Sequence, residues 1–157
     1  MTNIKIRVAT ESDAPVLARF RYKLRSFARE MIESEEEFNE RCIRWIQARL
    51  HDGSCWRCWL AECEAEPVGN IWSQLVEKIP NPAAETECYA YVTNFYVCEE
   101  YRAKGIGTRL LSEALTWAKT NNAHTVILWP RERSRSLYLR HGLTAADDLM
   151  QLTFGSS

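Results

Sequence analysis

The stretch Arg102-Ala103-Lys104-Gly105-Ile106-Gly107 places two basic side chains and two glycines directly before a helical pattern. The start of a helix exposes about four unbonded amides and the positive end of the helix dipole. The glycines would let an anion approach the backbone and would allow a positive φ, and the basic side chains would add charge. The sequence therefore predicts a turn that holds a pyrophosphate with main-chain amides. A turn whose glycines serve only tight packing is the alternative.

Two other phosphate-binding motifs do not fit this spacing. The P-loop pattern G-x-x-x-x-G-K-[ST] is absent from the chain. A dinucleotide-binding fingerprint would need a third glycine at the position of Leu110 and an acidic residue about 20 positions further on. Neither is present, so neither motif explains the turn.

The elements around the turn predict a strand–helix–strand unit. Residues Cys88–Val97 are apolar on both faces, which indicates a central strand. Residues after Gly105 repeat apolar side chains at helical spacing, and residues His124–Trp129 indicate a second buried strand. The two strands should be parallel with a right-handed crossover. By simple alternation, Thr93 and Phe95 should share one face of the first strand.

The rest of the chain predicts two helices before this unit, a hairpin and a short C-terminal helix and strand. Ser34 and Glu37 have the spacing of a capping box for the second helix. The expected ranges are a strand at 4–9, a helix within 10–30, a helix from 34 to about 50, hairpin strands at about 57–63 and 68–76, a helix within 134–142 and a strand at 149–154.

Composition excludes several classes of protein. The 157 residues carry a net charge of −1, which gives no general attraction to nucleic acid or to an anionic membrane. Because the chain has no apolar run long enough for a membrane span and no signal-peptide pattern, we expect a cytoplasmic protein. The six cysteines should be free thiols, and Cys55-x-x-Cys58 lacks the second ligand pair of a zinc site, so we expect no metal.

The turn, with its surroundings, resembles the GCN5-related N-acetyltransferases (GNAT). Residues 102–107 match that family's [RQ]-x-x-G-x-[GA] loop, and Leu137-Tyr138 with Gly142-Leu143 is similar to its L-Y-x-x-x-G-F segment. The resemblance implies an α/β (α+β) fold: a twisted mixed sheet, mostly antiparallel with one parallel pair, and helices on both faces. It also implies that residues 1–157 form a single acyl-CoA N-acyltransferase domain.

The resemblance implies an activity with assigned residues. The chain would transfer an acetyl group from acetyl-CoA, its cosubstrate, to the primary amine of a small molecule by direct attack in a ternary complex. Tyr138 would be the general acid toward sulfur, and amides of the Phe95–Val97 strand would stabilise the thioester oxygen. Arg131, Ser134 and Leu143 depart from the family's usual Asn, Ala and Phe, so Ser134 or Arg131 would replace the Asn contact to the cofactor. The implied cofactor-binding residues are Phe95, Tyr96, Val97, Arg102, Ala103, Lys104, Gly105, Ile106, Gly107, Thr108 and Ser134.

The general base and the acceptor stay open at this point. Candidates near the acceptor side are Glu87, Tyr89, Tyr91 and Asn94, of which Asn94 can position but cannot accept a proton, and a water chain is the alternative. A peptide or protein amine, or a non-catalytic acyl-CoA-binding module, are the competing functions. A sheet edge that pairs with a second subunit would give a homodimer.

Two further groups of residues could shape the acceptor site. The carboxylates at 33 and 35–37 would attract a cationic amine, but at a helix N-terminus they are better explained as solvated groups that stabilise the dipole. Four tryptophans could include a pocket wall, but most are expected in the core. They are Trp45, Trp56, Trp59 and Trp72.

Overall fold

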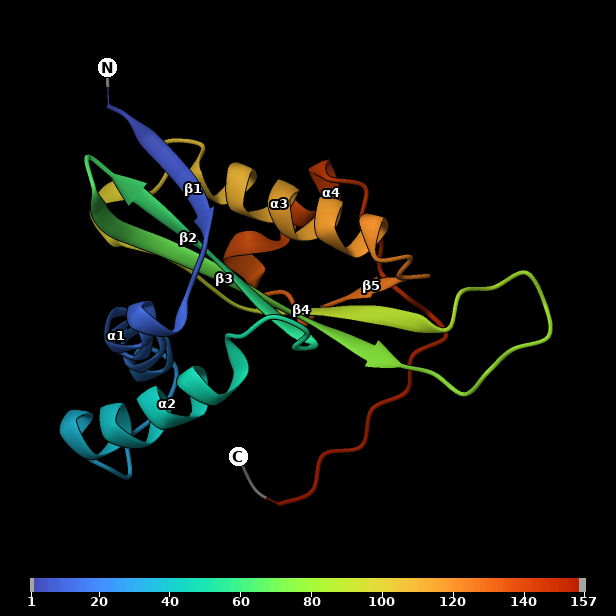
Figure 1. Cartoon of the computed structure of the whole chain (residues 1–157), viewed down its shortest axis with the longest axis horizontal. Helices are drawn as coiled ribbons and strands as arrows, with labels where there is room; N and C mark the ends of the chain where they lie inside the picture. Colours follow the sequence, from blue (N-terminus) through green and yellow to red (C-terminus); the bar gives the residue numbers. More distant parts are fainter. Residues whose placement is uncertain (1, 156–157) are drawn as a thin grey trace.

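Five strands form one twisted sheet in the order β1-β2-β3-β4-β5 (Figure 1) in the computed structural model, which describes residues 2–155. The first four strands are antiparallel neighbours, and only β4 and β5 are parallel. This arrangement confirms the expected mixed sheet with one parallel pair. The strands are β1 (Ile4–Val8), β2 (Trp56–Cys63), β3 (Glu66–Glu77), β4 (Cys88–Val97) and β5 (Val126–Ile127).

Helices cover both faces of the sheet, as expected (Figure 1). One face packs against α1 (Ala14–Ser26) and α2 (Glu35–Arg49), and its core includes the fully buried Leu17. The other face packs against α3 (Ile106–Thr120) and α4 (Arg135–Arg140). The sheet therefore separates two apolar cores. Three short 3-10 helices precede longer elements. Glu11–Asp13 leads into α1, Glu99–Tyr101 leads into the turn before α3, and Glu132–Ser134 leads into α4.

Local sequence explains where the first two helices begin. The amide of Glu37 donates to the Ser34 hydroxyl at 3.2 Å, and the Glu37 carboxylate accepts from the Ser34 amide at 3.0 Å. The predicted capping box of α2 is thus confirmed. Pro15 lies in the first turn of α1, where its missing N–H costs no helical hydrogen bond.

Two predicted strands differ from the structure. β5 contains only Val126–Ile127 of the expected His124–Trp129, because its pairing with β4 is confined to two residues. No strand forms at 149–154 within the described residues; Leu149, Leu152 and Phe154 are exposed there. The tail has an apolar pattern, but it has no paired neighbour within residues 2–155, and a strand needs one.

A β-bulge in β4 overturns the simple alternation expected for that strand. Thr93 pairs with Trp72 and Tyr96 pairs with Asn70, so two residues of β4 oppose one of β3. Asn94, inside the bulge, has φ +54°. Phe95 consequently packs in the α3-side core, whereas Thr93 faces the other side of the sheet. The prediction that these two side chains share a face is wrong.

None of the helices in residues 2–155 has the length and apolar character that crossing a bilayer requires.

Candidate active site

The turn before α3 has the backbone that the glycine spacing predicts. Gly105 has φ +81° and caps α3, and Ala103 has φ +60°. The amides of residues 103–108 donate no hydrogen bond within the described chain. The turn thus offers a run of unpaired donors at the positive end of the helix, where each hydrogen bond to a charged group contributes about 1.5–3 kcal/mol.

The two glycines are needed for different reasons. A Cβ at Gly105 would meet nothing within 4 Å, so only its positive φ requires glycine there. A Cβ at Gly107 would lie 3.2 Å from the Phe95 ring and 3.6 Å from Leu137. Gly107 therefore lets α3 pack closely against β4 and α4. The packing explanation holds for this second glycine.

The side chains of the turn hold its shape and supply positive charge. Arg102 Nε donates to the Val97 carbonyl at 3.0 Å, which ties the turn to the end of β4. Lys104 Nζ lies 5.2 Å from the centre of the Tyr101 ring. Ile106 is buried in the core, whereas Thr108 is exposed beside it. Both basic groups lack a carboxylate partner within residues 2–155.

Strands β4 and β5 separate next to this turn. Their pairing stops at Tyr91, yet β4 continues to Val97. The amide of Cys98 donates to Val68 of β3 at 2.8 Å. Because successive residues of a strand direct their amides to opposite edges, that of Val97 faces the side that β5 has left. An extended ligand can add to this edge as a further strand would.

Tyr138 of α4 lines a small cavity near the point where β4 and β5 separate. The cavity measures about 180 Å³ and is also lined by Phe95, Arg131 and Ser134. Tyr138 is 8% exposed and packs on Phe95, with ring centres 6.3 Å apart. Its hydroxyl has no hydrogen-bond partner in the described residues. Burial raises the pKa of this phenol, and the nearby Arg131 opposes that rise in part, so the group can donate a proton at neutral pH.

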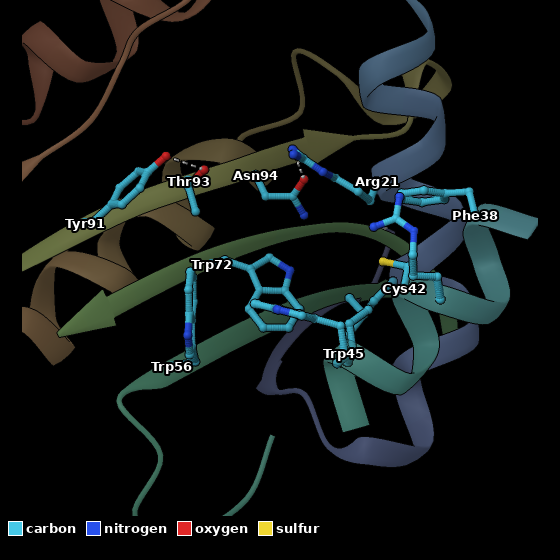
Figure 2. Close-up of a pocket in the computed structure, with 12 residues that line it drawn as sticks. Arg21, Phe38, Cys42, Trp45, Trp56, Trp72, Tyr91, Thr93 and Asn94 are labelled. Carbon is cyan, nitrogen blue, oxygen red and sulfur yellow. Dashed lines mark hydrogen bonds between the residues drawn. The ribbon is translucent and has the colours of Figure 1, made fainter. Parts of the chain in front are cut away.

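A larger cavity of about 560 Å³ adjoins the small one on the α1–α2 side of the sheet (Figure 2). The two cavities share Arg21, Tyr91, Thr93 and Asn94. Arg21 Nη1 donates to Asn94 Oδ1 at 3.2 Å, and this pair marks the junction. Three tryptophans from α2, β2 and β3 form one wall of the larger cavity: Trp45, Trp56 and Trp72.

Residues 19–143 match the model of the acetyltransferase (GNAT) family. The chain belongs to the GNAT acetyltransferase family. It is therefore an N-acetyltransferase, and acetyl-CoA is the donor that enzymes of this family use. The match covers the turn before α3, both parallel strands and Tyr138.

Solved structures show the same fold along nearly the whole GNAT chain. A GCN5-related N-acetyltransferase from Ralstonia eutropha JMP134 has a TM-score of 0.80 at 22% identity, covering 98% of this chain and 100% of that one. A predicted acetyltransferase with acetyl-CoA from Clostridium acetobutylicum has a TM-score of 0.81 at 22% identity, covering 96% of each chain. An aminoglycoside N-acetyltransferase, AAC(6')-Iy in complex with CoA, has a TM-score of 0.75 at 9% identity, covering 98% and 95%. The curated proteins contain no match.

Two of the four candidates for the general base line a cavity, and two do not. Tyr91 and Asn94 line the larger cavity, and the Tyr91 hydroxyl donates to Thr93 at 3.1 Å. Glu87 instead accepts from the Asn81 amide at 2.9 Å in the β3–β4 loop and lines neither cavity. Tyr89 lines neither cavity as well.

The carboxylates at 33 and 35–37 line neither cavity. Glu33 pairs with Arg41, and Glu37 serves the capping box. Trp59 and Trp72 are 3% and 4% exposed, as expected for the core. Trp72 also lines the larger cavity, together with Trp45 and Trp56. Sequence reasoning missed Arg21. Its signal was a charged residue on the buried face of α1.

The cysteines offer no metal site in residues 2–155, where no group of three or more His, Cys, Asp or Glu side chains could hold an ion. Cys58 and Cys63 are buried in β2, where burial raises the pKa of the Cys58 thiol.

Proposed function

We propose that this GNAT chain acetylates the primary amine of a small molecule, by direct attack on acetyl-CoA in a ternary complex. The observation that carries the proposal is the junction of two cavities. The smaller one contains Tyr138, and the larger one has the volume of a small-molecule site. An amine bound in the larger cavity would reach the thioester at Asn94, which lines both.

The donor fits the residues of the turn and the separated strands. The unpaired amides of residues 103–108 would hold the diphosphate, with Arg102 and Lys104 adding charge. The open edge of Phe95–Val97 would pair with the pantetheine arm. Ser134 lines the small cavity beside that edge, as does Arg131, so either side chain can take the place of the family's usual Asn.

The reaction forms a bond from the amine nitrogen to the acetyl carbon and breaks the bond from that carbon to sulfur. An amide of the Phe95–Val97 edge would stabilise the charge that develops on the carbonyl oxygen. Tyr138 would donate its proton to the departing thiolate. Among the described residues no Asp, Glu or His lines either cavity, the Tyr91 hydroxyl is a donor to Thr93, and burial raises the pKa of the Cys42 thiol. We therefore assign removal of the amine proton to a water chain.

The wall of the larger cavity favours a small acceptor over a peptide or protein. Trp45 packs on Trp56 and Trp72 with ring centres 5.2 and 5.8 Å away, and this cluster bounds the side between α2 and the sheet. The free hydroxyl of Tyr138 favours catalysis over a module that only binds acyl-CoA. We also propose that residues 1–157 act as one acyltransferase domain, since β1, which precedes the matched region, pairs with β2.

A panel of acceptors tests the proposal. Purified chain with acetyl-CoA would be incubated with small primary amines and with peptides, and acetylated products would be measured by mass spectrometry. We expect acetylation of a small amine with a kcat/KM at least tenfold above that of any peptide. Acetyl-CoA binding without turnover of any acceptor would contradict catalysis, and a preference for peptides would contradict the acceptor class.

A further inference from the structure

We propose that the acceptor carries a carboxylate beside its amine and an apolar side group, as an aromatic α-amino acid does, and that Arg21 binds the carboxylate. This inference rests on the proposed function and names the chemical class of its acceptor. It follows from the charge and the walls of the two cavities.

Arg21 occupies a helix position that normally belongs to the core. Leu17 and Leu24, four residues before it and three after it, are both buried on the inner face of α1. Arg21 Nη1 donates to the neutral Asn94, but its guanidinium forms no ion pair in the described part of the chain. Because a partly buried charge without a counter-charge is unfavourable, this position predicts an anionic ligand.

The surroundings of Arg21 increase the demand for an anion. The pKa of Arg21 is lowered by burial and then by Arg25, with a smaller effect from Arg131. Four arginines and no acidic residue line the two cavities, although the whole chain has a net charge of −1. Within residues 2–155, Arg41 alone among the four has a carboxylate partner, Glu33.

The donor does not account for this charge. None of residues 102–108 lines either cavity, so the proposed diphosphate site is separate from Arg21. Arg21 instead lies at the junction of the two cavities. An α-amino acid carries its amine and its carboxylate on the same carbon. With the carboxylate on Arg21, the amine would lie at the junction, next to Asn94 and the cavity of Tyr138.

Another wall of the larger cavity is apolar and aromatic (Figure 2). Trp45, Trp56 and Trp72 contact one another there with ring centres 5.2–6.1 Å apart. Aromatic rings pack favourably edge-to-face at such distances. The cavity of about 560 Å³ leaves ample room for one further ring. A polycation would instead meet the arginines without a carboxylate to bind it.

Three matched ligands isolate the carboxylate: phenylalanine, phenylalaninamide and phenethylamine. Their binding would be followed in the presence of CoA by the fluorescence of the cavity tryptophans, and their acetylation by kcat/KM. We expect phenylalanine to be preferred by about 10–100-fold in both measurements, the effect of one charged hydrogen-bonded contact. Equal or better binding of phenethylamine would overturn the proposal, as would a preference for glucosamine 6-phosphate or an aminoglycoside.

Substitutions of Arg21 test whether that residue provides the preference. Arg21→Gln keeps an N–H donor for Asn94 and removes the charge, so the ratio between phenylalanine and phenethylamine should fall toward one. Arg21→Lys should keep part of the ratio. Arg19→Gln removes an exposed charge from the same helix and should leave the ratio unchanged. An unchanged ratio in Arg21→Gln would refute the assignment.

The two proposals fail in different ways. If no acceptor of any kind is acetylated, the proposed function is contradicted. The ranking of the three ligand affinities by fluorescence then still tests whether Arg21 binds a carboxylate. If small amines without a carboxylate are the best substrates, the function stands and this inference falls.

Discussion

Tyr138→Phe removes one oxygen atom whose only assigned role is to protonate a thiolate. The hydroxyl has no hydrogen-bond partner within residues 2–155, so its loss should change the free energy of unfolding by about 0.5 kcal/mol or less. General acid catalysis contributes about 10²–10⁴-fold. Burial raises the pKa of this phenol, while a thiol has a pKa near ~8.5, so proton transfer from Tyr138 to sulfur is unfavourable.

Because the pKa of the phenol lies above that of the thiol, we expect the loss of kcat at the lower end of the 10²–10⁴-fold range. This loss is about 100-fold, or about 2.7 kcal/mol of transition-state stabilisation. The KM for acetyl-CoA should change little, because the diphosphate contacts remain. Cys55 is an exposed free thiol, so turnover is best followed by the loss of thioester absorbance and not with a thiol reagent. Tyr22→Phe is the matched control, since Tyr22 packs on Phe38 and lines neither cavity.

The pH dependence gives an independent check. The folded pKa of Tyr138 lies above its ordinary value of 10, so the phenol keeps its proton throughout the neutral range. The decrease in kcat that is caused by deprotonation of Tyr138 should therefore begin only above about pH 10. A Tyr138→Phe enzyme whose kcat stays within about threefold of the unmodified chain would refute the role of this residue.

Three further outcomes are expected. Gly105→Ala places a side chain at φ +81° and should cost about 1 kcal/mol of stability and weaken CoA binding; a calorimetric affinity equal to that of the unmodified chain would count against the turn. Asp13 receives two hydrogen bonds of 2.8 Å from Arg7, which lower its pKa below 3.8, so its stabilisation is present above pH 4 and is lost as the pH falls through the folded value. Asp13→Asn should therefore lose about 1 kcal/mol in denaturant titrations at pH 7 and less as the pH is lowered below 4; a loss that does not depend on pH would argue against the ion pair. We also keep the homodimer as a proposal: Met150 and Phe154 are 96% and 88% exposed, so deletion of residues 149–157 should turn a dimer into a monomer in light scattering, and a monomeric full chain would exclude it.

Much of the fold could be predicted because its signals are local. The capping box at Ser34 depends on two residues three positions apart, and the turn at Gly105 depends on the one residue that adopts a positive φ freely. The parallel pair followed from the length of the segment between two apolar runs. These features need no knowledge of distant contacts.

The rest could not be predicted because it depends on contacts between distant segments. The bulge at Asn94 is a mismatch of register between β3 and β4, and no local pattern shows it. The length of β5 depends on where the sheet separates, and the tail at 149–154 has a strand-like pattern without a neighbour to pair with. Amphipathic patterns place residues inward but do not show whether they meet a core or a cavity. Trp45, for example, lies on the apolar side of α2 and lines the larger cavity, whereas Arg21 on the inner face of α1 was a signal that could have been used.

The central claim is that the amides of residues 103–108 hold the diphosphate of acetyl-CoA, and amide NMR tests it most directly. The labelled chain would be titrated with CoA and, separately, with pantetheine, which lacks the diphosphate. We predict large shifts of the amide resonances of residues 103–108 with CoA and small ones with pantetheine. Resonances in this turn that stay in place at saturating CoA would contradict the account.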